Sequence, residues 1–586
     1  MYQEWSLNVL YQGIGAPKLQ ADLQQLETVI AAYKQAVGAL DAAQPAASLR
    51  AVVEVSEEMT LLTRRLMSYF SLRRSANSAD AEGAAYMTRL QGLTTATAKE
   101  TVVFQKFAGN LPDLEQIVES DDLLREYRFY FQEIQNAVSH KMGDEAEAVF
   151  AQMNISGGRA WSDQVAYLTS SVEVDYKGGK TTLSAIRGLA DSEDAAERKA
   201  AYEAELACYG KIKDAIAFSL NSIKAQVNLE AKLRGFQDPL DMTLNQSRMR
   251  RETLDAMLQA MREAMPKFRA YLKHKAKLLG HENGLPWYDI LAPIGHADGT
   301  SYTAEQAHAY LVEHFESFAP DLAQMTDTAF REEWIDFHPR AGKVGGAFCM
   351  NLPFLHQSRI LTNFSGSFGS VVTLAHELGH AYHGLQIQSH RPMNTGYSMP
   401  VAETASNFNE LIIVNDAIRK AEGEQKLQLI ESQIQDCTQI IVDIYSRFLF
   451  EDEVIRRRKD TFLFAGDLEQ IMLNAQKEAF GDGLDPAYLH PYMWCCKSHY
   501  YRPNLSYYNF PYAFGGLFSR GLYARYLEEG EAFLPKYRAL LKATTVDTVE
   551  NVAKIAGIDL TQPEFWRTSL AMITDQIDQF IAQTDK

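Results

Sequence analysis

Cysteine is scarce in this sequence, with five residues among 586. They are Cys208, Cys349, Cys437, Cys495 and Cys496, an odd number with wide spacing and one adjacent pair. A disulfide framework needs paired cysteines in a short chain, and a structural zinc site needs closely spaced Cys or His pairs. The sequence has neither pattern, so we expect reduced and mostly buried thiols.

Long apolar runs are also missing. No segment reaches the roughly 20 consecutive apolar residues that a transmembrane helix needs. The N-terminal stretch Met-Tyr-Gln-Glu-Trp-Ser-Leu does not combine basic residues with a following apolar run, as a secretory signal does. With the reduced thiols, these absences predict a soluble cytoplasmic protein that does not bind membranes.

Positive charge is in the minority, because 57 Lys and Arg residues stand against 75 Asp and Glu residues, for a formal net charge of −18. Proteins that bind nucleic acids grip the phosphate backbone with clustered Lys and Arg, so no nucleic-acid partner is expected. A hydrophobic content of 46% excludes intrinsic disorder. A chain of this length can bury a large core and still leave an internal cleft.

Helical periodicity dominates the first third of the chain. Apolar residues recur every three or four positions from Leu19 to Leu40, and a second stripe follows from Leu62 to Phe70. Nothing in this region suggests chemistry. We interpret both stripes as the buried faces of packed helices.

The pattern changes around residues 172–176, where apolar and polar residues alternate before a Gly178-Gly179 turn. We place a lobe boundary close to this strand-like segment. The sequence therefore predicts an N-terminal helical lobe at residues 1–185 and a second lobe at residues 186–586.

A second strand-like region lies between about residues 333 and 364. Ile335 and Phe337 alternate with polar residues, and a short apolar stretch follows Gly345-Gly346. We expect a small sheet of a few strands here, directly before the segment that carries the strongest chemical signal.

That segment is His376-Glu377-Leu378-Gly379-His380, which lies in a helical pattern. Histidines four positions apart are close to one helical turn apart, so His376 and His380 project from one face. Two such imidazoles can hold one Zn²⁺, and Glu377 then lies beside the ion, where it can take a proton from the attacking water. With 14 His in the chain, chance gives about 0.02 such motifs. The alternative is two histidines satisfied on an amphipathic helix.

A catalytic zinc ion needs a third protein ligand and one open position. The downstream candidates are His383, His390, Glu403 and Glu410. His383 shares the face of the first two histidines, but three ligands from one straight helix surround a tetrahedral ion poorly. A metzincin would have Gly three residues and His six residues after the second His; His383 and Gln386 occupy these positions, which excludes that class.

Glu403 is better placed. Ser398 and Pro400 indicate the start of a new helix, with Pro tolerated in its first turn. Glu403, Asn407 and Glu410 share one face of that helix, so Glu403 can complete a two-His-one-Glu site. Asn407 or Glu410 can then orient a ligating imidazole by a hydrogen bond.

Hydrolysis also requires donors that stabilise the oxyanion of the tetrahedral intermediate. The segment from His499 to Gly515 is rich in imidazole and hydroxyl groups. Residues 500–512 include five Tyr, whereas the 28 Tyr of the chain predict about 0.6. Core packing is the alternative for some of them, but it explains the whole run poorly.

At this point the sequence resembles the thimet oligopeptidase superfamily, and more closely its oligoendopeptidase F branch of bacterial enzymes. The resemblance spans nearly the whole chain and rests on Trp5–Tyr11, Asn363–Gly366, Thr373–Ala381, Ala402–Ser406 with Glu410, and the region of His499 and Tyr512. The two metal motifs are its most specific part.

The resemblance implies that Glu403 is the third zinc ligand, a choice that the geometry left open. It also implies that His499 and Tyr512 bind substrate and stabilise the intermediate. Tyr508 is a further candidate for this role, because Phe510 stands where some relatives have a Tyr.

The fold that the resemblance implies is mainly α-helical, with two lobes around a deep substrate channel and a small β-sheet beside the zinc helix. Gly345, Gly346, Ala347 and Phe348 resemble the edge strand on which family members lay the peptide. An exposed edge can pair with any extended backbone, whatever its side chains.

These observations predict a zinc-dependent endopeptidase, similar to oligoendopeptidase F, that hydrolyses internal bonds of short unstructured peptides. Two alternatives remain. One is an exopeptidase of the dipeptidyl carboxypeptidase type on the same scaffold, which needs a blocked channel and a cation for the substrate terminus. The other is a zinc-bearing peptide-binding protein without turnover, against which the intact Glu377 argues.

Overall fold

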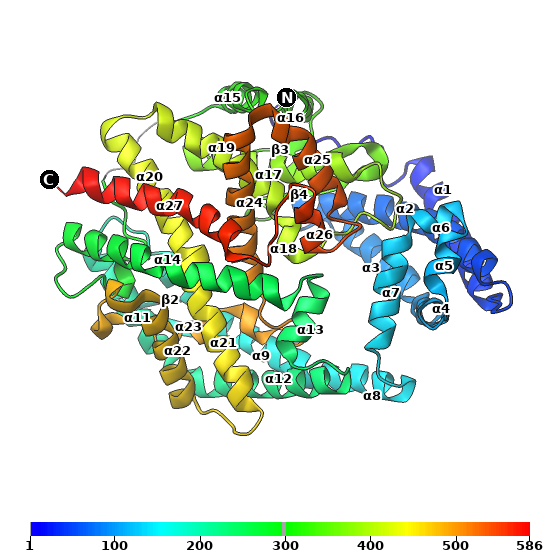
Figure 1. The fold of residues 1–586 in the computed structure, drawn as a ribbon, viewed down its shortest axis with the longest axis horizontal. Coiled ribbons are helices and arrows are strands. Elements are labelled where there is room, and N and C mark those ends of the chain that lie inside the picture. Colours follow the sequence, from blue (N-terminus) through cyan, green and yellow to red (C-terminus); the bar gives the residue numbers. More distant parts are fainter. Residues whose placement is uncertain (1, 296–300, 586) are drawn as a thin grey trace.

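Helices make up most of the structure, a computed structural model that describes residues 2–295 and 301–585 (Figure 1). Two small sheets accompany them in the described residues. The expectation of a mainly α-helical fold with a small β-sheet is confirmed.

The elements have the following bounds. Helices before residue 296 are α1 (Pro17–Gly38), α2 (Pro45–Ala76), α3 (Ala81–Thr95), α4 (Ala98–Gly109), α5 (Leu114–Glu119), α6 (Asp122–Glu126), α7 (Arg128–Ser139), α8 (Asp144–Asn154), α9 (Ala160–Ser171), α10 (Leu183–Arg187), α11 (Ala195–Tyr209), α12 (Lys213–Leu233), α13 (Pro239–Gln246) and α14 (Arg251–Leu278). Helices after residue 300 are α15 (Ala304–Glu316), α16 (Pro320–Arg331), α17 (Phe368–Ile387), α18 (Met399–Ala402), α19 (Thr404–Lys420), α20 (Gly423–Thr438), α21 (Ile444–Arg458), α22 (Ala465–Phe480), α23 (Met493–Cys496), α24 (Phe510–Glu529), α25 (Leu534–Ala543), α26 (Val549–Lys554) and α27 (Pro563–Thr584). The strands are β1 (Glu173–Tyr176), β2 (Gly179–Thr182), β3 (Ile335–Asp336), β4 (Phe348–Leu352) and β5 (Gln357–Leu361).

The N-terminal helices α1 and α2 pack against each other through the two apolar stripes of the sequence. Leu19 and Leu26 of α1 and Leu66 and Phe70 of α2 are completely buried. Each helix begins with a proline in its first turn, where the missing N–H has no intrahelical partner to lose. The stripes therefore form core, as the periodicity predicts.

Strands β1 and β2 form an antiparallel hairpin at the change of pattern around residue 172. Its two turn residues, Lys177 and Gly178, have φ of 48° and 79°, as the tightest hairpin turns require. The glycine at the second position adopts this conformation without strain.

The second sheet has the strand order β3-β5-β4, with β3 parallel and β4 antiparallel to β5. Strand β4 is therefore an edge strand of this sheet in the described residues. The sheet lies against α17, and Asn351 of β4 donates its Nδ2 to the carbonyl of His380 on that helix at 3.1 Å. Strand β3 is shorter than the alternation predicts, and its Asp336 is completely buried because two basic side chains pair with it.

The N-terminal segment reaches this same sheet. Phe337 donates its N–H to the carbonyl of Gln3, and Ser6 donates to the carbonyl of Glu333, both at 2.9 Å. Trp5 of this segment belongs to one apolar cluster with the buried Leu352 of β4. Residues on both sides of the predicted lobe boundary thus share a core.

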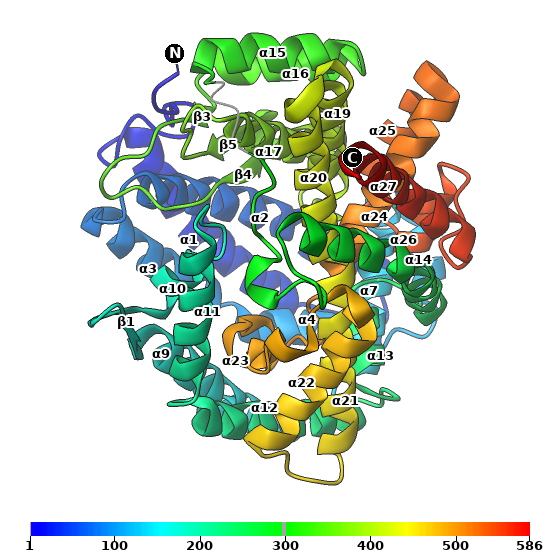
Figure 2. The same cartoon turned by 90° about the vertical axis from the view of Figure 1, so that its left-hand side faces the viewer.

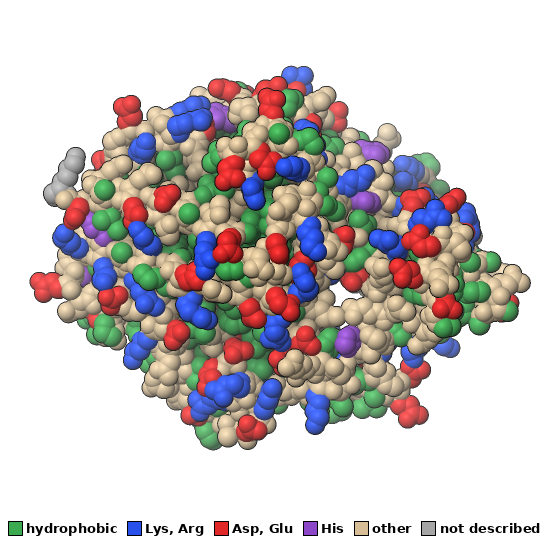
Figure 3. Space-filling view, viewed as in Figure 1, with side chains coloured by type: hydrophobic (Ala, Val, Ile, Leu, Met, Phe, Trp, Pro, Cys, Tyr) green, Lys and Arg blue, Asp and Glu red, His purple; other side chains and the backbone are tan. Residues whose placement is uncertain are grey.

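Two groups of helices lie on opposite sides of the view in Figure 2. In Figure 2, α1–α3 and α9–α11 lie on the left, whereas α14, α19–α22, α24, α25 and α27 lie on the right. Figure 3 shows the surface hollowed between α7 and α13, with acidic and basic side chains interspersed over this face. The lobe boundary at residue 185 stays a prediction.

Two further expectations can be compared with the structure. All five cysteines are unpaired, and three of them are buried. Among the described residues, no helix combines the length and the apolar content that crossing a membrane would require.

Candidate active site

Helix α17 brings the two motif histidines together. Its first turn is capped by Ser367, whose side chain accepts a hydrogen bond from the N–H of Ser370. One helical turn separates His376 and His380, and their ring centroids lie 4.9 Å apart. Both side chains are partly exposed, as a site that must admit a ligand requires.

Glu403 lies at the junction of α18 and α19. As predicted, a helix begins after Ser398 with Pro400 in its first turn. It is interrupted at Glu403, whose φ of −95° and ψ of 11° are not helical, and α19 begins at the next residue. This interruption places the Glu403 carboxylate at the start of α19, facing α17.

The close approach of α19 to α17 depends on Gly379. A Cβ atom at this position would lie 2.4 Å from the carbonyl oxygen of Ala405 and 2.5 Å from the Cα of Ser406. Both neighbours are backbone atoms, so they cannot swing away as a flexible side chain can. The glycine of the motif thus lets the two helices touch where the site forms.

The three candidate ligand atoms converge. Glu403 Oε2 lies 3.3 Å from His376 Nε2 and 3.4 Å from His380 Nε2. In the described part of the chain, these residues form the His/Cys/Asp/Glu group with atoms close enough to share a metal ion. Ligands at roughly 2.0–2.1 Å from a tetrahedral zinc ion are about 3.3–3.4 Å apart. Both distances from Glu403 therefore fit one Zn²⁺ shared with the two imidazoles.

Glu410 fixes one of the two imidazoles. Its Oε1 lies 2.5 Å from Nδ1 of His376, which leaves Nε2 of this ring facing Glu403. Burial alone would lower the pKa of His376, but the hydrogen bond and charge of Glu410 raise it to about 9. Asn407, the other candidate for this role, makes no side-chain hydrogen bond to either histidine in the described residues; its Nδ2 lies near Gly515.

Glu377, between the two motif histidines, is only 5% exposed. Its Oε2 atom has no hydrogen-bond partner within the described residues. Burial raises the pKa of Glu377 to about 7, against the opposing charge of His376. A carboxylate with a pKa near neutrality suits a residue that accepts and later returns a proton.

The other two histidine candidates are engaged elsewhere. His383 is completely buried, bonds Thr544 Oγ1 through Nε2 at 2.8 Å and stacks on Tyr397 at a centroid distance of 4.4 Å. His390 Nε2 lies 2.8 Å from the carbonyl of Lys542. Neither belongs to the group of residues that could hold a metal ion.

Three of the five tyrosines in residues 500–512 are core residues. Tyr500, Tyr501 and Tyr507 are at most 3% exposed. The hydroxyl of Tyr501 donates to the carbonyl of Trp494, and that of Tyr507 donates to Asp452. Core packing therefore accounts for this part of the run.

The remaining two tyrosines, Tyr508 and Tyr512, surround His499. The ring centroid of His499 lies 4.8 Å from that of Tyr508 and 5.7 Å from that of Tyr512. Nδ1 of His499 contacts Asn509 Oδ1 at 3.0 Å, and burial lowers the pKa of this imidazole. Burial, with a hydrogen bond to Tyr508, raises the pKa of Tyr512, so its hydroxyl keeps its proton and can donate it in a hydrogen bond.

Helix α24 carries this donor cluster to the metal-binding group. A Cβ atom at Gly515 would lie 3.1 Å from the Cβ of Glu403. Tyr512 precedes Gly515 by three positions, so both lie on the same side of α24. The side chain of Tyr512 is 37% exposed, in contrast to the buried positions that follow it.

The predicted substrate-binding residues lie at the beginning of the edge strand β4. Gly345 and Gly346 are exposed, and Ala347 and Phe348 are half-buried. Strand β4 pairs with β5 from Phe348 onward. The structure thus brings these residues to a sheet edge beside α17.

Three polar residues that support the site were missed in the sequence. Asn409 donates its Nδ2 to the carbonyl of Ala375, and Ser406 donates its hydroxyl to Glu403 Oε2 at 2.6 Å. Asn351 holds the carbonyl of His380, as described above. Asn409 is next to Glu410 in the sequence. Its hydrogen bond goes to a backbone carbonyl on α17, and no sequence pattern marks such a contact.

Comparisons with known proteins identify the family. The sequence model described as Peptidase family M3 matches residues 188–572, and the one described as Oligopeptidase F matches residues 111–171. The Oligopeptidase PepF of Bacillus subtilis (strain 168) is 23% identical over 475 residues, which cover 80% of this chain and 70% of the relative. The Oligoendopeptidase F homolog of Mycoplasma pneumoniae is 24% identical over 598 residues, which cover 97% of this chain and 96% of the relative.

Solved structures agree on the fold. The crystal structure of a protein from Chlamydophila abortus has a TM-score of 0.86 at 18% identity and covers 99% of this chain and 98% of its own. The structure of oligoendopeptidase-F from Enterococcus faecium has a TM-score of 0.70 at 19% identity, with coverage of 97% and 99%. At these identities the likeness concerns the fold.

Proposed function

The chain belongs to peptidase family M3, and from this premise we propose that it is a zinc-dependent endopeptidase for short unstructured peptides, similar to oligoendopeptidase F. The family expected from the sequence motifs is therefore right. The observation that most directly supports the proposal is the convergence of His376 Nε2, His380 Nε2 and Glu403 Oε2 at 3.3–3.4 Å.

We assign one Zn²⁺ per chain to His376, His380 and Glu403. When bound, the ion polarises the scissile carbonyl and makes water a stronger nucleophile near neutral pH. Glu410 holds the His376 ring by its Nδ1 atom, which keeps Nε2 directed into the site.

Glu377 acts as the general base. Its buried carboxylate takes the proton of the attacking water on one oxygen and returns it to the nitrogen of the leaving amine. The pKa of about 7 and the unpartnered Oε2 atom support this role, because a proton can be held there and released near neutral pH.

Tyr512 donates a hydrogen bond to the oxyanion of the tetrahedral intermediate, assisted by His499 or Tyr508. All three side chains are in contact, and α24 lies against Glu403. Donors fixed in advance of the reaction stabilise the developing charge without having to reorganise.

The substrate binds as an extended chain along the edge at Gly345–Phe348. A channel between the lobes at residues 1–185 and 186–586 admits peptides and excludes folded proteins. The five unpaired thiols fit a reducing, cytoplasmic environment for this activity.

The test uses quenched-fluorescence peptides of graded length, with a folded protein as control. Wild type should cleave the peptides, chelator should abolish cleavage, and the folded protein should stay intact. Glu377→Gln should retain zinc, measured as metal per chain, while activity falls by several orders of magnitude. Turnover near wild type in this variant would remove Glu377 from the mechanism.

A peptide blocked at both termini distinguishes the proposal from the exopeptidase alternative. An endopeptidase cuts it at internal bonds, and mass spectrometry of the products locates them. Cleavage that occurs only with a free terminus would contradict the proposal.

A further inference from the structure

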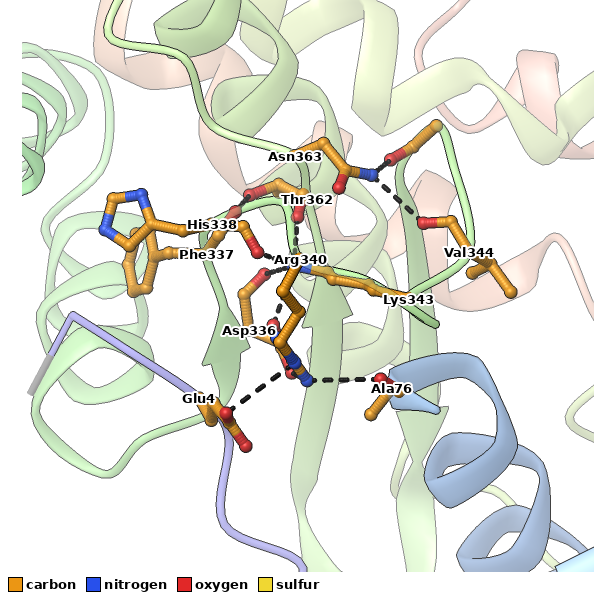
Figure 4. A network of polar contacts seen from close by, with 11 residues as sticks. Glu4, Ala76, Asp336, Phe337, His338, Arg340, Lys343, Val344, Thr362 and Asn363 are labelled. Carbon is orange, nitrogen blue, oxygen red and sulfur yellow. Dashed lines mark hydrogen bonds and ion pairs between the residues drawn. The ribbon is translucent and has the colours of Figure 1, made fainter. Parts of the chain in front are cut away.

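The loop between β3 and β4 is held by a buried lysine (Figure 4). The Nζ atom of Lys343 lies 2.7 Å from Asp336 Oδ1 and donates to the carbonyls of His338 at 2.9 Å and Thr362 at 2.5 Å. Neither Lys343 nor Asp336 has an exposed side chain. The ammonium group, which also lies 3.2 Å from the carbonyl of Asp336, ties the loop to the ends of β3 and β5.

A second cation locks the same carboxylate. Arg340 binds both oxygens of Asp336, at 2.6 and 2.8 Å, and also reaches the carbonyl of Ala76 at the end of α2. The bidentate geometry fixes the orientation of Asp336 as well as its position. The start of the loop is therefore rigid.

Asn363 holds the other end of the loop, directly before β4. Its Nδ2 atom donates to the carbonyl of Val344 at 3.1 Å and to that of Gly346 at 2.8 Å. The backbone N–H and C=O groups of Gly345 and Ala347, by contrast, have no hydrogen-bond partner in the described part of the chain. Asn363 thus anchors Val344 and Gly346, whereas the backbone groups of Gly345 and Ala347 stay free for another chain.

Neither packing nor backbone conformation within this chain requires a glycine at position 345. A Cβ atom there would meet nothing within 4 Å, and its φ does not lie in the left-handed region. Gly346, with a φ of 78°, does need to be a glycine. The bare backbone at Gly345 is consistent with a second backbone that comes close to it from outside the chain.

We propose that Asn363 is a positioning residue for the peptide-binding edge, supported by Lys343, and that it aims the free backbone groups of Gly345 and Ala347 at the substrate. The proposal rests on the proposed function and deepens it. Asn363 does not touch the reacting atoms; it acts through the loop that it holds. Its loss should therefore weaken binding of an extended peptide and leave the hydrolytic step intact.

The primary experiment compares Asn363→Ala and Asn363→Asp with wild type. A carboxylate has the shape of the amide but cannot donate, so both variants should fail in the same way. We expect KM for a long peptide to rise about tenfold, equivalent to 1.4 kcal/mol of binding free energy, with kcat within about twofold of wild type. Zinc per chain should not change.

Gly345→Val tests the same edge by filling the space that the substrate backbone would occupy. Because the position is exposed and open, the variant should keep the melting temperature of wild type. A branched side chain there blocks a second backbone, so KM should rise as it does in Asn363→Ala.

Asn221→Ala is the control for loss of a buried asparagine that donates to two carbonyls. Asn221 lies on α12, at the opposite end of the molecule (Figure 1). Its Nδ2 donates to the carbonyls of Ala217 and Leu463, both at 2.7 Å, and its Oδ1 accepts from the N–H of Leu463 at 2.8 Å, so the substitution removes one hydrogen bond more than Asn363→Ala does. This variant should lose stability but keep the KM of wild type. A rise in KM here equal to that of Asn363→Ala would show that general destabilisation is the cause and overturn the proposal.

A wild-type KM in Asn363→Ala, or a fall in kcat without a change in KM, would also overturn the proposal. Failure of the proposed function has a different signature. In that case wild type itself shows no metal-dependent cleavage, whatever residue stands at position 363.

Discussion

Two of the three candidate metal ligands, His376 and Glu403, are held by a neighbouring side chain. His376 gives Nδ1 to Glu410 and keeps Nε2 free for the site. Glu403 accepts a hydrogen bond from Ser406 on the same oxygen that faces both imidazoles. These hydrogen bonds fix the orientation of the His376 ring and the Glu403 carboxylate before a metal ion binds.

The donor pair Tyr508 and Tyr512 can be separated by substitution. Tyr512→Phe should lower kcat by about 10²–10³, as for a lost oxyanion donor. Tyr508→Phe should have a smaller effect, because Tyr508 acts only through its hydrogen bond to the hydroxyl of Tyr512. Steady-state kinetics on one peptide measures both. A normal kcat in Tyr512→Phe with a strong loss in Tyr508→Phe would exchange the two roles.

His383 should make the fold sensitive to acid. Burial lowers its pKa to about 3, whereas the histidine of the unfolded chain titrates near 6.5. Between these two pKa values the unfolded chain carries a proton on His383 and the folded protein does not. The contribution to stability is intact above about pH 6.5 and is lost as pH falls toward the folded pKa, by at most about 1.4 kcal/mol per pH unit.

Urea unfolding of metal-free protein between about pH 7.5 and about pH 5 measures this slope. In His383→Gln the free energy of unfolding should fall less steeply as pH falls, with a slope smaller by the equivalent of up to one bound proton. His338→Gln, at an exposed histidine, is the control and should follow wild type. Parallel curves for His383→Gln and wild type would exclude His383 as the source.

Among the secondary-structure elements, the crossing of α17 and α19 decides whether a site exists. Glu403 directly precedes α19 and the histidines lie on α17, so the separation of these two helices sets the distances from Glu403 to both imidazoles. Gly379 is where the two backbones come closest.

Gly379→Ala should push the helices apart. With backbone atoms 2.4 and 2.5 Å from the new Cβ, we expect a loss of about 1–3 kcal/mol in the free energy of unfolding and weaker zinc binding. Gly92→Ala in α3 is the matched control, because a Cβ there meets nothing within 4 Å. It should be neutral or gain about 0.5–1 kcal/mol. Denaturation curves and zinc retained after dialysis test both variants; normal zinc retention in Gly379→Ala would refute the crossing argument.

Local patterns were enough to predict α17, the helix start after Ser398 and the β1–β2 hairpin, because spacing, proline and glycine act within a few residues. The burial of Asp336 was not predictable, since its partners Arg340 and Lys343 give no periodic signal. The roles of Asn351 and Asn409 were equally hidden. Each of them binds a backbone carbonyl that only the folded arrangement brings near.

The tyrosine-rich segment illustrates the same limit. Composition identified the run as unusual, but it could not divide buried Tyr500, Tyr501 and Tyr507 from the two that contact His499. The division depends on how the 3₁₀ turn at Ser498–Tyr501 and the start of α24 orient successive side chains. The candidate ligands, in contrast, were named from spacing together with family resemblance.

Over the whole molecule, the boundary predicted at residue 185 does not separate the cores. Trp5, Leu10 and Leu66 from the first part pack in one cluster with Leu352 and Leu361 of the sheet. The sheet beside α17 therefore has one of its faces covered by the N-terminal helices.

A fragment of residues 186–586 should therefore be insoluble or lack a cooperative unfolding transition. Its sheet would expose Leu352 and Leu361, which are completely buried in the whole chain. Co-expression with residues 1–185 should restore soluble protein, measured by size-exclusion chromatography. A soluble 186–586 fragment with a sharp melting transition would show that the second part folds alone.

The pairing of the N-terminal segment with the sheet also sets an order of events during synthesis. Ser6 bonds to Glu333, so its partner exists only after about 330 further residues have been synthesised. At about 5–20 residues per second this delay is about 15–65 s, and the donors on α24 are made later still. A nascent chain therefore spends most of its synthesis without the completed sheet edge and without helix α24.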